Sequence, residues 1–186
     1  MKKIISILVF TILIVILFTV FYPVAILGIA QLAPNQGKGE TVSVNGTVVG
    51  YQKIGQKFDK STYFWGRPSA VDYNAAGSGG SNKGPSNPDY LTQVQKRIDT
   101  FLIAHPNLNK AEIPAEMVTA SGSGLDPNIS VQGAKIQMVR IAKARNISVI
   151  RIDSIVTEHT EKRLMGVFGV DKINVFLLNI ELDKVK

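Results

Sequence analysis

The chain has 186 residues, 21 Lys and Arg against 14 Asp and Glu, a formal net charge of +7 and no cysteine. The lack of cysteine excludes disulfides, thiolate zinc sites, iron–sulfur clusters and cysteine nucleophiles, and two histidines are too few for a three-histidine metal site. With 45% hydrophobic residues the chain is too apolar to be disordered throughout. Its length suits one ordinary domain with an appendage.

The first predicted element is a membrane-spanning helix. No charged side chain occurs from Ile4 to Gly37, and Ile4 to Phe21 consists almost entirely of Ile, Leu, Val and Phe. About 20 apolar residues cross a bilayer as a helix, which pairs its own backbone N–H and C=O groups inside the lipid. Phe21 and Tyr22 are typical of the membrane interface, and Pro23 is expected to kink the helix rather than abolish it.

A cleaved signal peptide is the alternative interpretation of this segment. Lys2 and Lys3 form a basic start, and Gly28-Ile29-Ala30 offers small residues at the spacing of a cleavage site. The apolar run is longer than the roughly 7–15 residues of a signal-peptide core, which favours an uncleaved anchor. Because no basic residue follows the helix until Lys38, the positive-inside rule puts the N-terminus in the cytoplasm and the rest of the chain outside.

The predicted organisation has three parts. Residues 1–33 form the cytoplasmic start and the transmembrane signal-anchor helix, 34–47 form a polar linker, and 48–186 form one extracytoplasmic domain of mixed α/β (α+β) class. In that domain Thr47 to Ile54 alternates as a strand does. Helices are predicted over about fifteen residues after Asn87, from Ser130 or Val131 to Arg145, and after Ser148. The apolar segment 174–182 fits a helix or a buried strand, and its periodicity does not decide between them.

Several polar residues near these elements have a structural interpretation. Asn87-Pro88-Asp89 supplies an N-cap, a proline in the first turn and an acid at the start of the first helix. The basic residues towards Arg145 are interpreted as a solvated face that complements the helix dipole. His105 and His159 are expected at the surface or at helix ends. Residues 66–88, rich in Gly and Pro, form either a flexible linker or an ordered loop.

Three short segments resemble functional motifs, but each lacks a feature that the motif requires. Thr47-Val-Val-Gly-Tyr-Gln52 resembles one loop of a potassium-channel filter, but a filter needs four such loops around a pore. Asp59-Lys60-Ser61-Thr62 lacks the glycine of the phosphorylated-aspartate motif of P-type ATPases. The glycine-rich stretch 77–83 lacks the spacing of a phosphate-binding P-loop. We therefore expect no catalytic residues, no metal site and no nucleic-acid partner.

One loop retains chemical interest. Thr119-Ala-Ser-Gly-Ser-Gly-Leu-Asp-Pro127 precedes the helix that is predicted to open near Ser130. Exposed amides at a helix N-terminus bind anions such as phosphate. The alternative, which we favour, is that Asp126, Pro127 and Ser130 shape a turn and cap the helix.

Several longer strings occur together and in order: Tyr63-Phe-Trp-Gly-Arg-Pro-Ser-Ala70, Ser78-Gly-Gly-Ser-Asn82 with Ser86-Asn-Pro88, Pro114-Ala-Glu-Met-Val-Thr-Ala-Ser-Gly-Ser-Gly-Leu-Asp126, Arg140-Ile-Ala-Lys-Ala-Arg145 and Asn174-Val-Phe-Leu-Leu-Asn-Ile-Glu-Leu182. With the N-terminal anchor, they make nearly the whole chain resemble the C subunit of Kdp high-affinity potassium-transporting ATPases. Departures are small, at Lys83, Gly84 and Asn128.

This resemblance implies a non-catalytic accessory subunit in the plasma membrane of a prokaryote. Its implied partners are a channel-like A subunit, which carries potassium, and a P-type ATPase B subunit, which uses ATP. The chain itself is expected to bind no cofactor. The family is also described as a catalytic chaperone that raises the ATP affinity of the B subunit, although the charge rule places this domain on the side away from ATP.

Two sets of residues follow as candidates. For partner contact or loop ordering they are Trp65, Arg67, Asn82, Asn87 and Asp126. For nucleotide contact, under the chaperone alternative only, they are Ser121, Gly122, Ser123, Gly124 and Gln132.

Overall fold

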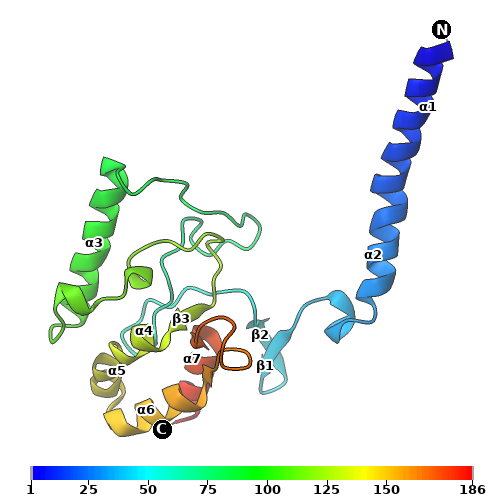
Figure 1. Ribbon diagram of the computed structural model, residues 1–186. Helices are drawn as coiled ribbons and strands as arrows, with labels where there is room; N and C mark the ends of the chain where they lie inside the picture. The colour runs from blue at the N-terminus through cyan, green and yellow to red at the C-terminus, as the bar shows by residue number, and fades with distance from the viewer. Residues whose placement is uncertain (1, 186) are drawn as a thin grey trace. The chain divides into compact units, whose positions relative to one another are not determined.

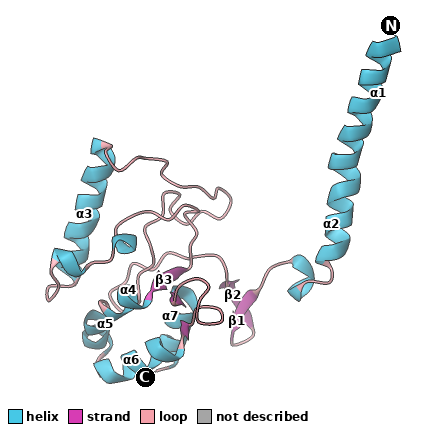
Figure 2. Cartoon of the chain, in the orientation of Figure 1, coloured by secondary structure: helices cyan, strands magenta, loops and turns pink. Residues whose placement is uncertain are grey.

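The computed structural model describes residues 2–185, which divide into two compact units at the bond between Tyr51 and Gln52 (Figure 1). The N-terminal unit is a long helix followed by a β-hairpin. The C-terminal unit combines helices with a small sheet and long irregular segments (Figure 2). The structure thus confirms one N-terminal apolar helix and one mixed α/β domain.

The N-terminal helix is continuous from Lys2 to Ala30, 29 residues in all. It consists of α1 (Lys2–Ile16), one π-helical turn η1 (Leu17–Phe21) and α2 (Tyr22–Ala30). The wider turn directly precedes the turn with Pro23, whose ring crowds the carbonyl four residues earlier and whose nitrogen donates no hydrogen bond. The helix therefore continues through the proline, as predicted. At about 1.5 Å per residue it is longer than a hydrocarbon core of about 30 Å.

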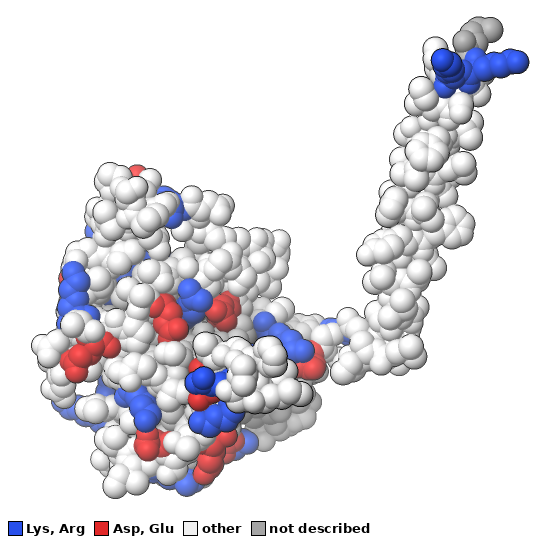
Figure 3. Space-filling model, viewed as in Figure 1, with Lys and Arg blue, Asp and Glu red and all other residues white. Residues whose placement is uncertain are grey.

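The side chains of this helix are exposed along its whole length. No residue of α1, η1 or α2 is buried, and every Ile, Leu, Val and Phe from Ile4 to Ile29 is on the surface. In Figure 3 the shaft carries no charged atoms, and the lysines lie at its N-terminal end. A helix that is apolar on all sides and uncovered by protein suits a lipid environment.

The hairpin pairs β1 (Thr41–Val44) with β2 (Thr47–Tyr51) in antiparallel fashion. Its two-residue turn is Asn45-Gly46, and both residues have positive φ, 52° and 80°, as a type I′ turn requires. The strand predicted from Thr47 is confirmed as far as Tyr51. The segment 34–47, predicted as a polar linker, differs from that prediction because it contains a 3₁₀ turn, η2 (Pro34–Gly37), and the strand β1.

The sheet of the C-terminal unit has three short antiparallel strands in the order β3-β5-β4. They are β3 (Asn128–Ser130), β4 (Thr160–Glu161) and β5 (Lys172–Asn174). The central strand pairs Ile173 with Ile129 on one side and with Thr160 on the other. Both isoleucines are buried, so this small sheet contributes directly to the core.

Five helices surround the sheet and its connecting loops: α3 (Pro88–Ala104), α4 (Val131–Lys135), α5 (Met138–Arg145), α6 (Val149–Glu158) and α7 (Val175–Lys184). Two single 3₁₀ turns, η3 (Lys110–Glu112) and η4 (Ala115–Met117), follow α3. Side-chain N-caps set four of these helix starts: Asn87 accepts from the Tyr90 amide, Ser130 from Gly133, Ser148 from Arg151 and Asn174 from Leu177. The predicted starts after Asn87 and Ser148 are confirmed.

The helix predicted from Ser130 to Arg145 is interrupted at Gln137. The Gln137 amide bonds to the Ala134 carbonyl, three residues back, in place of the Gly133 carbonyl of a regular helix. The Gln137 side-chain Nε2 donates to that Gly133 carbonyl instead, at 2.9 Å. The tighter turn ends α4 and lets α5 start in a new direction, with the Gln137 side chain fully buried.

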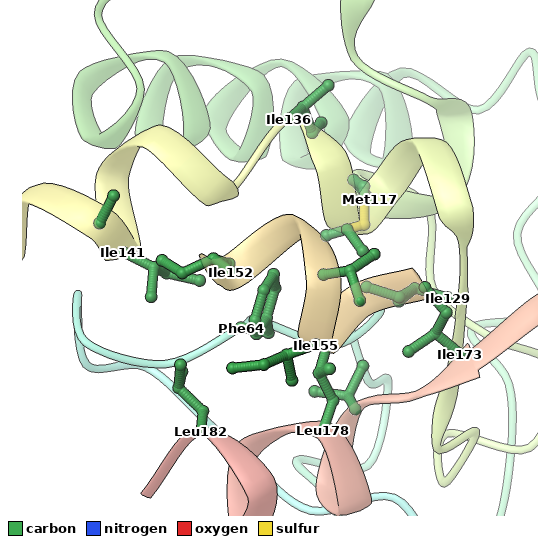
Figure 4. Packing of buried hydrophobic residues seen from close by; sticks show 14 of the residues in the cluster. Phe64, Met117, Ile129, Ile136, Ile141, Ile152, Ile155, Ile173, Leu178 and Leu182 are labelled. Carbon is green, nitrogen blue, oxygen red and sulfur yellow. The ribbon is translucent and has the colours of Figure 1, made fainter. Parts of the chain in front are cut away.

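The C-terminal segment 174–182 is a helix preceded by a strand residue. Asn174 ends β5 and caps α7, which buries Val175, Phe176, Leu178, Asn179 and Leu182. Leu177 and Ile180, on the other side, are still half-buried, so apolar residues occur all round the helix and periodicity alone could not distinguish helix from strand. The core that results is drawn in Figure 4, where Phe64, from the irregular segment before α3, points into the middle of the cluster. The fully buried side chains include Phe64, Ile129, Ile141, Ile152, Ile173, Leu178 and Leu182.

Candidate functional site

The strongest concentration of polar contacts lies around the segment Tyr63–Trp65. Asn179 of α7 accepts from the Phe64 amide at 2.9 Å and donates to the Phe64 carbonyl at 3.0 Å. Gln137 accepts from the Trp65 amide at 2.8 Å and donates to the Trp65 carbonyl at 3.1 Å. Each carboxamide satisfies both backbone groups of one residue, as a neighbouring strand would. Two side chains thus hold an extended segment that has no sheet partner among the described residues.

Arg140 of α5 fixes the turn before this segment. Its guanidinium donates to the carbonyls of Lys60, Ser61 and Tyr63, the last at 2.9 Å. It also lies over the indole of Trp65, 4.3 Å from the ring centroid. Burial lowers the pKa of Arg140 to about 10, which still leaves it charged at neutral pH. A charged group with this many carbonyl acceptors orders the backbone around it.

His105, at the C-terminal end of α3, completes the group beneath Trp65. Its ring stacks on Phe101 at 4.1 Å, its Nδ1 bonds to the Phe101 carbonyl, and its Nε2 accepts from Arg140 Nε at 2.8 Å. This pattern requires a neutral imidazole with the proton on Nδ1. Burial, with the nearby Arg140 charge, lowers the pKa of His105 to about 4 despite the opposing bond to Phe101. The prediction of a helix-end residue is confirmed, but the side chain is buried rather than at the surface.

Arg145 extends the same arrangement to the end of the chain. Its Nε donates to the Thr62 carbonyl at 2.7 Å, and its guanidinium pairs with Asp183 of α7 at 2.7 Å. The Tyr63 hydroxyl donates to the other oxygen of that carboxylate at 2.9 Å. The interpretation of the basic residues of α5 as a solvated face is therefore wrong for Arg140 and Arg145. Both turn inward because the carbonyl oxygens of Ser61, Thr62 and Tyr63 lie in an irregular segment and accept their hydrogen bonds from these two guanidinium groups.

The next part of the loop is held by an ion pair and a tyrosine. Arg67 pairs with Asp126 at 3.0 Å, and each side chain is about a quarter exposed, 26% and 28%. The Tyr73 hydroxyl donates to the Arg67 carbonyl at 2.5 Å, and burial raises the pKa of Tyr73 to about 12. Asp126 also accepts from the Asn128 amide, which ties the pair to the start of β3.

Trp65, Arg67 and Tyr73 line a cleft of about 440 Å³. Its walls come from the loop and from α3, and they combine aromatic rings with charges of both signs. They include Phe58, Trp65, Phe101, Lys57, Arg67, Asp72, Lys96 and Arg97. Among residues 2–185, no three His, Asp or Glu side chains come together as a group that could hold a metal ion. Arginines and carboxamides bound to backbone carbonyls fix a shape, so the chemistry of this region suits recognition.

The structure brings three of the five candidate contact residues together. Trp65, Arg67 and Asp126 belong to the cluster around the cleft. Asn87 lies apart from it as the N-cap of α3, and Asn82 is exposed with a left-handed backbone, φ 53°. For all five, a contact with another subunit stays a prediction.

Two amides of the candidate nucleotide loop already have partners. Ser121 donates to the Pro68 carbonyl at 3.1 Å, and Gly124 donates to the Ser121 carbonyl at 3.3 Å. Gly124 has φ 69°, and a Cβ there would lie 2.6 Å from a Val71 methyl group. The loop is thus packed against residues 68–79, and the amides of Ser121 and Gly124 are not free to donate to a phosphate.

Gln132 stands in different surroundings from that loop. It is exposed on α4 and lines a separate hollow of about 510 Å³ with Lys135 and Lys162. At the start of α4, the Glu116 carboxylate accepts from the Ser130 amide at 2.7 Å, and the Ser130 hydroxyl accepts from Gly133. Predicted capping by Ser130 is confirmed. Contact of Gln132 or residues 121–124 with a nucleotide stays a prediction.

Sequence reasoning missed the residues that organise this site. Gln137 and Asn179 are carboxamides within otherwise apolar stretches, and both are at most 1% exposed. A single carboxamide among apolar residues was the signal that the sequence offered, because such a side chain is buried with its neighbours and then needs hydrogen-bond partners close by. The partners could not be identified, since they lie 72 and 115 positions away in the chain.

Comparison with known proteins decides the family. The sequence model of the family described as "KdpC: K+-transporting ATPase, c chain" matches residues 4–184. The chain belongs to the KdpC family. It is 66% identical over 186 residues to the "Potassium-transporting ATPase KdpC subunit" of Flavobacterium psychrophilum, with both chains covered completely. Proteins with the same name from Flavobacterium johnsoniae and Bacteroides fragilis are 65% and 48% identical, covering 100% and 99% of those chains.

Membership covers both units, because the match includes the N-terminal helix and the C-terminal domain. The protein is a membrane-associated KdpC subunit of a K+-transporting ATPase. The segments that carried the resemblance in the sequence are those that the structure joins: Tyr63–Ala70, Arg140–Arg145 and Asn174–Leu182 meet through Arg140, Arg145 and Asn179.

Proposed function

We propose that the chain is a non-catalytic accessory subunit that assembles and stabilises a potassium-importing ATPase. Full-length membership of the KdpC family carries this proposal. The arrangement of the site supports it, because Arg140, Arg145, Gln137 and Asn179 are all engaged in holding a backbone segment. Such residues build a rigid surface for another protein to recognise. The channel-like A subunit and the ATPase B subunit, which use potassium and ATP, are the partners in this proposal.

The proposed topology has the N-terminus in the cytoplasm and residues 48–186 outside. The two lysines at the start of the helix support it through the positive-inside rule. Since the natural chain has no cysteine, Lys83→Cys and a single cysteine inserted between Met1 and Lys2 provide labelling sites of known position that keep both lysines. A membrane-impermeant maleimide added to intact spheroplasts should label Lys83→Cys, and the N-terminal cysteine only after lysis. The reverse pattern would overturn the topology.

In this proposal the helix packs against the transport subunits and the domain lies over the outer entrance of the potassium pathway. Complexes solubilised from cells that make only residues 1–30 of this chain test it. We expect a deficit of the A and B subunits in the purified complex and loss of high-affinity potassium uptake. Full assembly together with normal uptake would exclude a role for the domain.

The nucleotide-binding chaperone is the alternative that the same labelling experiment addresses. A domain that is accessible only from the outside cannot contact cytoplasmic ATP. The engaged amides of Ser121 and Gly124 favour the accessory role over this alternative.

A further inference from the structure

The segment between β4 and β5 carries an unusual set of exposed apolar side chains (Figure 1, orange). Leu164, Met165, Val167, Phe168 and Val170 are between 64% and 84% exposed. We call residues 163–170 the apolar loop. Single exposed apolar residues are common on proteins, but five within seven positions form a patch that normally contacts another surface.

The apolar loop has a defined conformation. Leu164 and Phe168 exchange two backbone hydrogen bonds of 2.9 Å, and the turn between them places Met165 and Gly166 at positive φ, 53° and 73°. The amides of Gly166 and Val167 bond to the carbonyls of Arg163 and Leu164, so four amides and carbonyls at the base of the turn and two amides within it are paired inside the loop itself. Its side chains are presented outward instead of folding back onto the domain.

A polar hollow of about 510 Å³ adjoins the base of the apolar loop and shares Arg163 and Val170 with it. Lys135, Lys162 and Arg163 line this hollow, with Asp171 as the one acid among the lining residues. Three residues with hydroxyl groups also line it, Ser130, Thr157 and Thr160; the Ser130 hydroxyl accepts from the Gly133 amide, and the Thr160 hydroxyl donates to the Val156 carbonyl. Cations outnumber the acid, and hydroxyls are good partners for phosphate oxygens.

Asp171 does not cancel the positive charge of the hollow. It lies 3.5 Å from Lys162 Nζ and 3.5 Å from Arg163 Nε, and exposed pairs at such distances are weak. Its best contact is the hydrogen bond from the Arg163 amide at 3.0 Å, which is the main reason that the pKa of Asp171 lies below its usual value. Lys135, Lys162 and Arg163 together outweigh the single charge of Asp171, so the hollow keeps a net positive charge that attracts an anion.

We propose that the apolar loop inserts into the bilayer surface and that the hollow beside it binds the headgroup of an anionic phospholipid. An apolar protrusion next to a cationic, hydroxyl-lined hollow matches the two halves of such a lipid. The chain already carries a membrane helix, so the domain stays within reach of the bilayer. The inference rests on membrane attachment and not on the accessory role, and it concerns a surface outside the cluster around Trp65.

The first test measures lipid contact of the loop in the full chain. Met165→Cys and Ile103→Cys introduce single cysteines at equally exposed apolar positions, 84% and 83%, one in the loop and one on α3. Each is labelled with an environment-sensitive fluorophore and reconstituted into vesicles of phosphatidylcholine with phosphatidylglycerol. We expect a blue shift and quenching by headgroup-proximal spin-labelled lipid for Met165→Cys only. Equal responses at both positions would overturn the insertion.

The second test addresses the headgroup. Vesicles of phosphatidylcholine alone should give several-fold less quenching at Met165→Cys. Adding Lys135→Gln, Lys162→Gln and Arg163→Gln should remove the preference for phosphatidylglycerol, by up to about fivefold per residue at low salt. Lys83→Gln, Lys96→Gln and Lys143→Gln are the matched control. Equal quenching in both lipid mixtures, or loss of the preference in the control, would overturn headgroup binding.

Two further outcomes separate lipid from other occupants. Inorganic phosphate in the buffer should not displace the loop from phosphatidylglycerol vesicles. Displacement by free phosphate would assign the hollow to a soluble anion and overturn the lipid proposal. Shielding of Met165→Cys only when the A and B subunits are co-reconstituted, without lipid quenching, would assign the loop to a protein contact. The quenching and phosphate experiments use the chain alone, so their results are independent of whether it assembles the complex.

Discussion

The two units of this protein use apolar side chains in opposite ways. From Ile4 to Ile29 the large apolar residues all point outward, whereas in the C-terminal unit Phe64, Ile152 and Leu178 are fully buried. The same residue types therefore serve two solvents, lipid in the first unit and the protein interior in the second. Hydrophobic content averaged over the chain describes neither unit, and the environment of each residue decides what a substitution costs.

Phe64→Ala should give the largest effect, because it removes a fully buried ring from the middle of the core. We expect a loss of about 3–5 kcal/mol in the free energy of unfolding of the C-terminal unit. Denaturant unfolding of the full chain in detergent, followed by the fluorescence of Trp65, measures it. Phe168→Ala is the matched control on an exposed phenylalanine and should change the stability by less than about 0.5 kcal/mol.

Leu13→Arg tests the lipid-facing unit. An arginine near the middle of the helix should cost about 2.5–3.5 kcal/mol in membrane insertion and leave the unfolding of the C-terminal unit unchanged. Carbonate extraction of membranes measures insertion. Leu32→Arg, placed after the helix end at Ala30, is the control and should insert normally. Equal insertion of both variants would contradict a membrane span.

Asn179→Leu tests the carboxamide clamp. The side chain keeps its approximate size, but the Phe64 amide and carbonyl lose both hydrogen bonds in a buried place. We expect a destabilisation of about 2–3 kcal/mol. Asn107→Leu, on an exposed position of the loop after α3, serves for comparison. Stability close to that of the natural chain would show that the clamp is dispensable.

His105 should make stability depend on pH. Its pKa is lowered to about 4 in the folded chain and is about 6.5 when unfolded, so protons favour the unfolded state. Stability is then constant above pH 6.5 and falls by about 1–2 kcal/mol as the pH drops towards 4, a figure reduced to allow for solvent screening. His105→Gln should flatten that part of the curve, while His159→Gln should keep it. A curve unaffected by His105→Gln would contradict a neutral buried imidazole.

Asn87→Ala should have the smallest effect of the five. It removes the N-cap of α3, whose side chain accepts from the Tyr90 amide at 3.0 Å. A loss of about 1 kcal/mol is expected in unfolding experiments. Asn87→Asp should retain the cap and serve as the rescue. If Asn87→Ala assembles poorly while its stability is normal, the residue contacts a partner as well.

Local signals predicted much of the fold. The apolar run predicted the N-terminal helix, and Asn87 and Ser148 marked helix starts, because these features act between residues close in sequence. The break at Gln137 and the helix after Asn174 were not predicted. Both depend on burial, and the Gln137 side chain replaces a helical hydrogen bond only because Trp65 brings further partners to it.

The candidate site was predicted in part. Trp65, Arg67 and Asp126 were singled out and do come together, whereas Asn82 and Asn87 lie elsewhere. Arg140 and Arg145 were interpreted as solvated because basic residues at a helix end usually are. Their actual acceptors, the carbonyls of residues 60–63, lie about eighty positions earlier in the chain and leave no trace in the local pattern of α5.

The sequence by itself determined the apolar anchor, the exclusion of disulfides and thiolate metal sites, and the order of most helices. Each of these follows from composition or from neighbours within a few positions. Only the tertiary structure decided which polar groups are buried and with whom. Gln137, Asn179 and Arg140 became the centre of the site because folding placed the backbone groups of residues 61–65, which belong to no helix or strand, against them. A buried hydrogen-bonding group must find a partner, and that partner is set by the packing of segments far apart in the chain.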